Sequence, residues 1–424
     1  MRGDPPHPPP RNVGVTPRPG RRTLGYVPSD KLRRVRDELV TLARSGLDRL
    51  SFVSAASDAV GRVVPHDRSC WHGVDPGTVL FTGSINRNVG CSGSWLAEHE
   101  YVVEDVNKWS FLARSGRRAG ATSLATHGDM SRSARHRSHE AYGIGDELRI
   151  SFVADDGTYW GAAGFLRDDD RPGFTEYDVR FAASLSEILA EAFRRALVAT
   201  VAAAADEPVT VGPGVVVFDE QGRAESISPA AEHWIGEMVE EPCPEPLTES
   251  KVLQAVTARA RTLREVRDPL QLSARSRVQT RTGSWLVVYC TPLSGGADGR
   301  TAVIIQPATP NEVAPLVAVA YGLTSRESQI TRLCMQGRST KEIALALHVS
   351  PYTVQDHLKS IFGKTGVRTR NELVGQVFLE HYVTRWEDVG EPPPGWTAKA
   401  IPESATGVTA SGTDGPDERP GSWR

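Results

Sequence analysis

Cysteine is scarce in this chain of 424 residues, and its five copies lie far apart. An odd number of widely spaced cysteines forms neither a disulfide framework nor the paired ligand spacing of a zinc site. Long apolar runs are missing too, since no stretch approaches the ~20 apolar residues that cross a bilayer. The proline-rich start has no apolar segment typical of a secretory signal. We therefore predict a cytoplasmic protein with reduced thiols and no membrane partner.

Sequence patterns typical of enzymes are also missing. The chain has no glycine-rich phosphate loop followed by Lys-Ser or Lys-Thr, and no Gly-x-Ser-x-Gly turn. His127, His136 and His139 share a stretch with several arginines, whose positive charge disfavours a metal ion. That stretch is expected to be a solvated segment or helix. We predict no catalytic residue, no metal and no cofactor.

The segment from residue 323 to residue 370 is the most informative part of the sequence. It contains four helix-start signals, three of which are a serine or threonine followed three residues later by glutamate. The other is a serine followed by Pro351, which suits the first helical turn. Gly337 and Gly366 fall where helices should end. The four capping residues are Thr324, Ser339, Ser350 and Thr369.

Apolar residues in this segment recur at helical spacing. In the third predicted helix, Val354, Leu358 and Ile361 form one stripe. The stripe should pack inward and leave a polar face in solvent. That face carries Thr353, Gln355, Asp356 and Lys359. A helix held down by an apolar stripe, with polar side chains on its N-terminal half, is the arrangement of a helix-turn-helix.

The charge of this segment differs from that of the whole chain. Residues 324–370 contain eight basic and three acidic residues, a net charge of +5, whereas the whole chain carries −3. A local basic excess in a mildly acidic protein indicates a partner that carries phosphates. A helical bundle that packs against a protein is the alternative, and both the charge and the polar face count against it.

These motifs resemble the DNA-binding domain of LuxR-type transcription regulators. Four blocks occur in the family's order: Leu-Thr-x-Arg-Glu, Ser-x-Lys-Glu-Ile-Ala, Ser-x-x-Thr-Val-x-x-His and Gly-Val-x-x-Arg. The match runs from Leu323 to about Tyr382. The resemblance implies a four-helix domain over residues 318–385 whose third helix enters the major groove of DNA. Its fourth helix, residues 370–382, is implied to contact a second copy of the chain.

Site residues follow from the same resemblance. Gln355, Asp356 and Lys359 match positions that face the groove, where Gln pairs with adenine, Asp with cytosine and Lys with guanine. A second set matches positions near phosphates, which orient the domain without reading sequence. This set is Thr340, Lys341, Thr353, Lys364, Arg368 and Arg370.

Two residues depart from the family pattern. His348 stands in the turn between helices two and three, where the family often has glycine, and histidine tolerates a positive φ better than most residues. Gly363 lies inside the third helix and should cost about 1 kcal/mol relative to alanine.

Residues 29–200 are expected to form an α/β domain. Helical spacing covers residues 30–50, and an irregular region with several tryptophans follows from Val63 to Leu112. Two strands, residues 147–153 and 159–166, are joined by an Asp-Asp-Gly hairpin turn and followed by a long helix. The order strand, hairpin, strand and closing helix resembles the C-terminal half of a GAF domain.

A GAF domain holds small molecules over its sheet, so aromatic residues in this part of the chain are candidates for pocket contacts. The candidates are Trp71, Trp95, Tyr101 and Trp109. The alternative is that these aromatic side chains belong to the ordinary core.

Residues 206–310 are expected to form a third unit. Strands are predicted at 213–219, 224–228, 278–280, 284–291 and 301–306, with a helix opening at Pro229. This order resembles a shortened PAS domain. No haem- or flavin-binding motif accompanies it, so the resemblance implies a relay or dimerisation domain without cofactor.

The predicted fold is α+β and multidomain, with disordered tails at residues 1–28 and 386–424. The predicted function is sequence-specific DNA binding in transcription regulation, controlled by the two upstream domains. Expected partners are double-stranded DNA, a second copy of the chain, and a small-molecule effector or RNA polymerase. The alternative function is a sensor or scaffold that acts through protein contacts alone.

Overall fold

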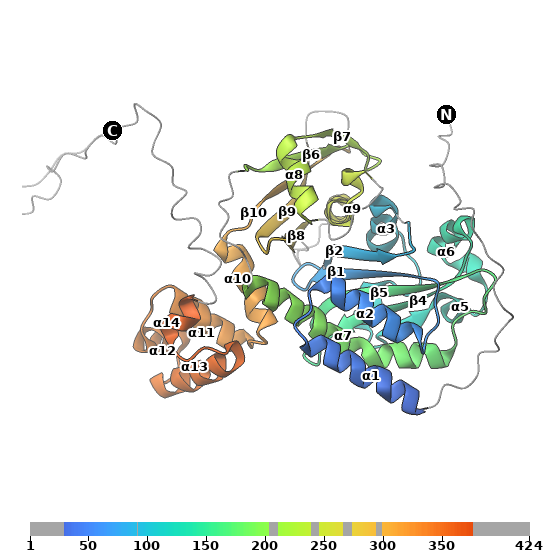
Figure 1. Ribbon diagram of the computed structural model, residues 1–424. Coiled ribbons are helices and arrows are strands. Elements are labelled where there is room, and N and C mark those ends of the chain that lie inside the picture. The colour runs from blue at the N-terminus through green and yellow to red at the C-terminus, as the bar shows by residue number, and fades with distance from the viewer. Residues whose placement is uncertain are drawn as a thin grey trace, which may run out of the picture.

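The chain folds into two antiparallel five-stranded sheets followed by a group of helices (Figure 1). This computed structural model describes residues 29–90, 92–202, 211–238, 246–265, 274–293 and 299–375. The architecture confirms the predicted α+β class. The two predicted tails, and the part of the predicted fourth helix beyond residue 375, lie outside the described residues.

The first sheet has the strand order β2-β1-β5-β4-β3, and neighbouring strands pair antiparallel. Three helices pack on one face, and several short helical elements lie on the other. The strands are β1 (Arg68–Asp75), β2 (Leu80–Arg87), β3 (Ala119–Ala121), β4 (Ile144–Val153) and β5 (Tyr159–Asp168). The three helices are α1 (Ser29–Arg44), α2 (Arg49–Gly61) and α7 (Glu176–Ala202).

The short elements are α3 (Gly93–Ala97), the π-helical turn η1 (Glu98–Val102), α4 (Trp109–Arg114), α5 (Thr122–Ala125), η2 (Met130–Arg132), α6 (Ala134–His139) and η3 (Glu140–Tyr142).

Two features of this unit differ from the sequence prediction. Strands β1 and β2 occupy the region predicted to be irregular. Seven of the eight residues of β1 are buried because packed segments cover both faces of this strand: Trp71 belongs to one buried cluster, and Cys70 and Val74 belong to the other. Its sequence therefore shows no alternation of apolar and polar residues. The single helix expected over residues 30–50 is two helices. The chain turns at Gly46, whose φ is +71°, and Asp48 caps α2 by accepting from Ser51 N.

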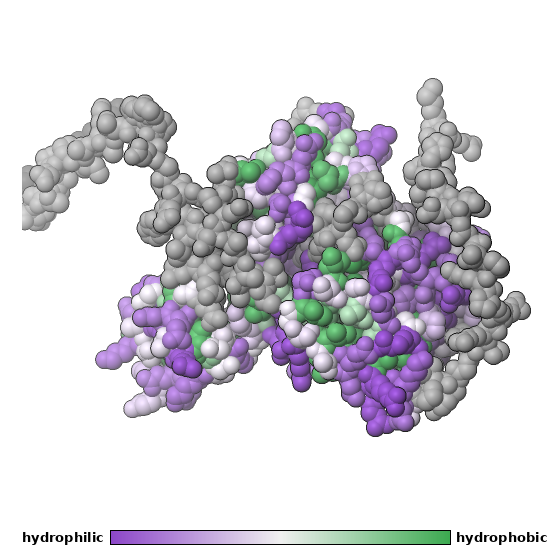
Figure 2. Space-filling view, viewed as in Figure 1, coloured by the Kyte–Doolittle hydropathy of each residue, from purple (hydrophilic) through white to green (hydrophobic). Residues whose placement is uncertain are grey.

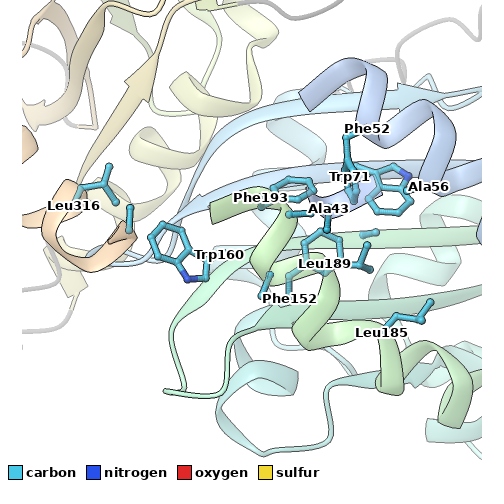
Figure 3. Packing of buried hydrophobic residues seen from close by; sticks show 14 of the residues in the cluster. Ala43, Phe52, Ala56, Trp71, Phe152, Trp160, Leu185, Leu189, Phe193 and Leu316 are labelled. Atoms are coloured by element: carbon cyan, nitrogen blue, oxygen red, sulfur yellow. The ribbon is translucent and has the colours of Figure 1, made fainter. Parts of the chain in front are cut away.

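The core of the first unit lies between the sheet and α7. Phe193 of α7 contacts Phe152 and Phe52, with ring centroids 4.9 and 6.3 Å apart (Figure 3). Gly161 allows this approach, because a Cβ there would lie 2.8 Å from the Phe152 ring and 3.0 Å from the Phe193 ring.

The second sheet has the order β7-β6-β10-β9-β8 and is also antiparallel. Four of its five strands lie close to the predicted ranges, whereas β8 begins three residues before the predicted start at residue 278. They are β6 (Gly214–Phe218), β7 (Ala224–Ile227), β8 (Arg275–Gln279), β9 (Trp285–Pro292) and β10 (Thr301–Pro307). The accompanying helices are α8 (Pro229–Met238), η4 (Leu247–Glu249) and α9 (Lys251–Glu265).

The two sheets share a hydrophobic core. Leu80 and Phe81 of β2 belong to the same buried cluster as Val252 and Leu253 of α9 and Val288 of β9. Since burial of apolar area is the main stabilising term in folding, the two sheet units support one another.

Helix α10 (Pro310–Ala320) leaves the second sheet and leads to the C-terminal helices. It packs against α7, and the Arg194 guanidinium of α7 donates to the carbonyl oxygen of Ala320. Gly322, with φ +68°, follows α10 and begins the connection to the next helix.

Candidate nucleic-acid interface

The C-terminal helices begin where their capping residues predict. They are α11 (Ser325–Met335), α12 (Thr340–Leu347), α13 (Pro351–Thr365) and α14 (Arg370–Val374). Thr324 and Ser339 form complete capping boxes, and Ser350 accepts from Thr353 N at 3.1 Å. At the start of α14, the Glu372 carboxylate accepts from Arg368 N at 2.7 Å.

The turn between α12 and α13 depends on His348. Its φ of 53° and ψ of 47° place it in the left-handed region, as the sequence predicted. Two residues later Ser350 starts α13, so α12 and α13 are joined by a tight turn. This is the connection that defines a helix-turn-helix.

Helix α13 is held by its apolar stripe. Val354 and Ile361 are fully buried, and Leu358 is 8% exposed. They meet Ile343 of α12 and Ile330 of α11 in the same buried cluster. The core of this domain therefore sets the rotation of α13 about its axis and decides which of its residues face solvent.

The opposite face of α13 is open. Gln355, Asp356 and Lys359 are all exposed. The Lys359 Nζ lies 3.7 Å from Asp356, and both side chains are more than three-quarters exposed, at 81% and 77%. A solvated pair of this kind is weak and restrains neither side chain. All three base-contact candidates thus lie on one accessible surface.

A buried carboxylate joins α11 to α13. Glu327 accepts from Thr324 N, Ser360 Oγ and Lys364 Nζ, each at 2.7 Å. Burial raises the pKa of Glu327, but hydrogen bonds from Lys364, Ser360 and Thr324 outweigh burial and bring it to about 2. The sequence identified Glu327 only as a capping residue, because its contacts with α13 span more than thirty residues.

The phosphate-contact candidates are in different environments. Lys341 and Arg368 are exposed. Lys364 is held by Glu327, with about a third of its side chain exposed. Arg370 donates to the carbonyl oxygens of Cys334 and Arg338, so it also supports the helix ends. The hydroxyl of Thr353 pairs with that of Ser350 at 2.9 Å, and Thr340 is half-buried at the start of α12. Phosphate contact stays a prediction for all six.

The positive charge of the segment is concentrated on five cations. Among the described residues, its three acidic residues each pair with a base: Glu327 with Lys364, Asp356 with Lys359, and Glu342 with Arg338. The five other cations are Arg326, Arg332, Lys341, Arg368 and Arg370. In the view of Figure 2, hydrophilic residues cover much of the outer surface around α13.

Two exposed side chains in this domain were missed from the sequence. Tyr352 in the first turn of α13 is 78% exposed, and Leu345 on α12 is 75% exposed. Tyr352 lies outside the apolar stripe of α13, a spacing that would have indicated its exposure. It adds an aromatic hydroxyl to the surface that carries Gln355 and Lys359.

The four aromatic pocket candidates lie inside the first unit. Trp71 packs against Phe152 and Phe165, and the Trp109 indole donates to Ala163 O at 3.0 Å. The Tyr101 hydroxyl accepts from Phe81 N at 3.2 Å, and Trp95 contacts the rings of His99 and His139. Their role as ligand contacts stays a prediction.

A buried ionic network accompanies these aromatic residues. Arg149 lies between Glu147 and Glu100, at 2.9 Å from each, and stacks 3.8 Å from the Trp109 ring. Arg135 lies in the histidine stretch that was expected to be a solvated segment or a helix. The stretch contains helix α6, and Arg135 is buried there and pairs with Glu147. His139 is buried in the same region, and burial lowers its pKa to about 3. Paired charges thus lie beside the aromatic candidates on this side of the sheet.

Neither a membrane helix nor a metal cluster occurs in the described ranges. None of the helices there combines the length and apolar character needed to cross a bilayer. Within the same ranges, no three His, Cys, Asp or Glu side chains are grouped to share a metal ion.

These C-terminal helices define a helix-turn-helix domain with an accessible third helix. The family model described as "Bacterial regulatory proteins, luxR family" matches residues 322–376. The spore germination protein GerE of Bacillus subtilis is 40% identical over 52 residues, which cover 12% of this chain and 70% of that protein. The chain belongs to the LuxR family of bacterial regulatory proteins.

Other relatives match over a smaller share of their length. The monoamine regulon transcriptional regulator of Klebsiella aerogenes is 42% identical over 57 residues, 13% of this chain and 25% of that protein. The chain spans 31% and 6% of two further HTH-type relatives, from Aeromonas salmonicida and Mycobacterium bovis.

Solved structures match over more of the chain but superimpose loosely. The crystal structure of Escherichia coli SdiA covers 81% of this chain and 95% of its own, with 11% identity and a TM-score of 0.27. A bacteriophytochrome from R. palustris covers 67% of this chain and 64% of its own, with 13% identity and a TM-score of 0.29.

Proposed function

We propose that this protein is a sequence-specific DNA-binding transcription regulator, regulatory rather than enzymatic. The observation that carries the proposal is the free polar face of α13. Its apolar stripe is buried, while Gln355, Asp356 and Lys359 are exposed on one side. A helix in this arrangement can enter the major groove with its hydrogen-bonding groups toward the base edges.

The proposed division of roles follows the exposure of each residue. Gln355, Asp356 and Lys359 read bases, while the cations around them neutralise phosphates. Lys341 and Arg368 are both exposed. Lys364 and Arg370 act from fixed positions, because Glu327 and the helix-end carbonyl oxygens hold them.

The upstream units are proposed to control this domain. The proposed bounds are 29–200 for a GAF-like unit, 206–310 for a PAS-like unit and 318–385 for the DNA-binding domain. Each upstream unit contains a five-stranded antiparallel sheet, and α10 connects the second sheet to α11. We further propose that the protein binds DNA as a homodimer and responds to a small-molecule effector or to RNA polymerase.

Binding to DNA can be tested with the full chain. Sequences would be selected from a random duplex library, and affinity measured by fluorescence anisotropy at several salt concentrations. Selective binding that weakens steeply with salt is expected. Lys359→Ala and Gln355→Ala should each reduce the preference for the selected site by about 1–3 kcal/mol, because each removes one side chain that pairs with a base.

Two control variants separate base reading from general attraction. Lys341→Ala should weaken binding to all sequences alike. It should also make the dependence of affinity on salt less steep, by the amount expected for the loss of about one phosphate contact. Lys31→Ala removes the same charge from an exposed position of α1 and should change neither the affinity for DNA nor its salt dependence. Base reading by α13 would be refuted if the unmodified protein bound selected and random DNA equally, or if Lys359→Ala and Gln355→Ala kept its full preference for the selected site.

A further inference from the structure

A small cavity lies where the first sheet, the second sheet and α10 meet. Its walls come from β1, β2, α2, α7, β5, β8, β9 and α10, so both sheet units and α10 contribute to it. Its lining includes Arg49, Val74, Trp160, Arg277, Trp285 and Leu316.

Arg277 and Asp75 form the fixed part of this cavity. The guanidinium donates to both Asp75 oxygens, at 2.8 and 2.6 Å, and to Glu312 O of α10 at 3.1 Å. Asp75 also accepts from Gly77 N and Arg277 N. Asp75, the one carboxylate among the described residues of the lining, is therefore committed to structural hydrogen bonds, and the Arg277–Asp75 pair binds the two sheets and α10 together.

Thr82, Gln279 and two tryptophans supply the uncharged polar side chains of the lining, and the two tryptophans have buried donors. The indole nitrogens of Trp160 and Trp285 are buried, and neither has an acceptor among the described residues. These two side chains are only 3% and 7% exposed. A buried donor without an acceptor is unfavourable, which makes two such donors in one cavity an indication of a missing acceptor.

Arg49 adds positive charge to the same cavity. Its guanidinium lies against β1, where a Cβ on Gly73 would come within 2.6 Å of Nη1. Burial lowers the pKa of Arg49 to about 10, so the side chain remains charged at neutral pH. The charged lining residues Arg49, Arg277 and Asp75 give a net charge of +1.

Much of the rest of the wall is apolar. Val74, Phe193, Leu197 and Leu316 line it, and Figure 3 shows the Trp160 ring beside Leu316 of α10. A ligand for this cavity needs an anionic, acceptor-rich end and a short apolar body. A carboxylate fits the planar donor fork of a guanidinium and also accepts from indole N–H groups.

We propose that this junction cavity binds a small monocarboxylate with a short aliphatic body. Its oxygens accept from Arg49 and from the Trp160 and Trp285 indoles, and its carbon chain contacts Leu316. The bound ligand fastens α10 to the first unit and thereby sets the position of the DNA-binding domain. This last step rests on the proposed function, because it assumes that the domain binds DNA.

Direct binding can be measured on the full chain labelled with 5-fluorotryptophan. Trp160→Phe and Trp285→Phe variants assign their two 19F resonances among those of the nine tryptophans. Titration with sodium butyrate should shift these two resonances saturably and leave the others unchanged. Butanamide is a neutral molecule of similar shape and should not shift these two resonances. Sodium chloride at equal ionic strength should not shift them either.

Variants test the assigned donors. Arg49→Met should weaken butyrate binding at least tenfold, whereas Arg180→Met, which removes an exposed arginine from α7, should leave it unchanged. Trp285→Phe removes one indole donor and keeps an aromatic ring at this position, and the Trp160 resonance should then report weaker binding. Undisturbed resonances of the other tryptophans would verify that each variant is folded.

DNA affinity in the presence of butyrate tests the coupling. Butyrate should change the dissociation constant for the selected duplex at least threefold in the unmodified protein and not in Arg49→Met. The site is refuted if butyrate gives no saturable shift, or if butanamide or chloride acts equally. Butyrate binding with unchanged DNA affinity refutes the coupling. Butyrate binding in a protein that binds no DNA refutes the proposed function and leaves the site standing.

Discussion

Replacing Glu327 by Gln should loosen the DNA-binding domain more than any other single change at a helix cap. The carboxylate is buried and accepts from the backbone of α11 and from two side chains of α13. Glutamine keeps the shape and one acceptor oxygen but removes the charge. Lys364 then loses its partner, and α13 loses a link to α11.

The expected loss follows from the pKa of Glu327. Its fall from 4.5 to about 2 corresponds to about 3 kcal/mol, at about 1.4 kcal/mol for each pH unit. About a third of the Lys364 side chain is exposed, and solvent screens such a pair. We therefore expect a loss of about 1–2 kcal/mol at pH 7.

The pH dependence has a defined sign. Because the folded pKa lies below the ordinary value, the stabilisation is fully present above pH 4.5 and is lost as the pH falls toward about 2. The difference between the unmodified protein and Glu327→Gln should therefore be constant near neutral pH and shrink in acid.

Hydrogen exchange of the full chain, followed in peptides from residues 323–375, measures this local stability. Glu342→Gln is the matched control, since Glu342 completes a capping box at the same position of α12 but is exposed. It should cause a smaller and more local loss of protection. Equal exchange in Glu327→Gln and the unmodified protein at pH 7 would refute the role assigned to this carboxylate.

Three further predictions concern other parts of the chain. Asp75→Asn leaves the Arg277 charge buried without its partner and should lower the free energy of unfolding by about 3–5 kcal/mol. Hydrogen exchange should then be faster in β1, β8 and α10. Unchanged hydrogen exchange in these elements would contradict the role of this pair. Gly363→Ala, inside α13, should stabilise the domain by about 0.5–1 kcal/mol, whereas Gly366→Ala should destabilise it because φ is +76°. Faster hydrogen exchange in Gly363→Ala than in Gly366→Ala would contradict this reasoning from backbone conformation. His348→Gly should stabilise the turn by about 0.5–1 kcal/mol, because glycine adopts the left-handed conformation without the steric cost of a Cβ. Slower hydrogen exchange at the start of α13 would verify this prediction.

The DNA-binding domain was predictable because its signals are local. A capping box joins residues three positions apart, and the stripe of α13 repeats within one helix. Such interactions depend on neighbours in the sequence, so Thr324, Ser339 and Ser350 marked the helix starts correctly. The burial of Val354 and the exposure of Gln355 followed from the same periodicity.

The first unit was less predictable because its burial depends on distant segments. Strand β1 has no alternating pattern, since other parts of the chain cover both of its faces. A charged side chain usually lies in solvent, yet Arg149 is buried between Glu147 and Glu100. Pairing of this kind reverses the usual preference of a charged side chain for solvent.

The amino-acid sequence by itself determined the family, the order of the C-terminal helices and the face that α13 leaves open. Only the tertiary structure decided that Lys364 is held by Glu327, that Asp75 and Arg277 join two sheets, and that two indoles share a cavity with Arg49. Helix signals arise from contacts a few residues apart. A cavity forms from segments more than two hundred residues apart, and their meeting depends on the packing of the whole chain.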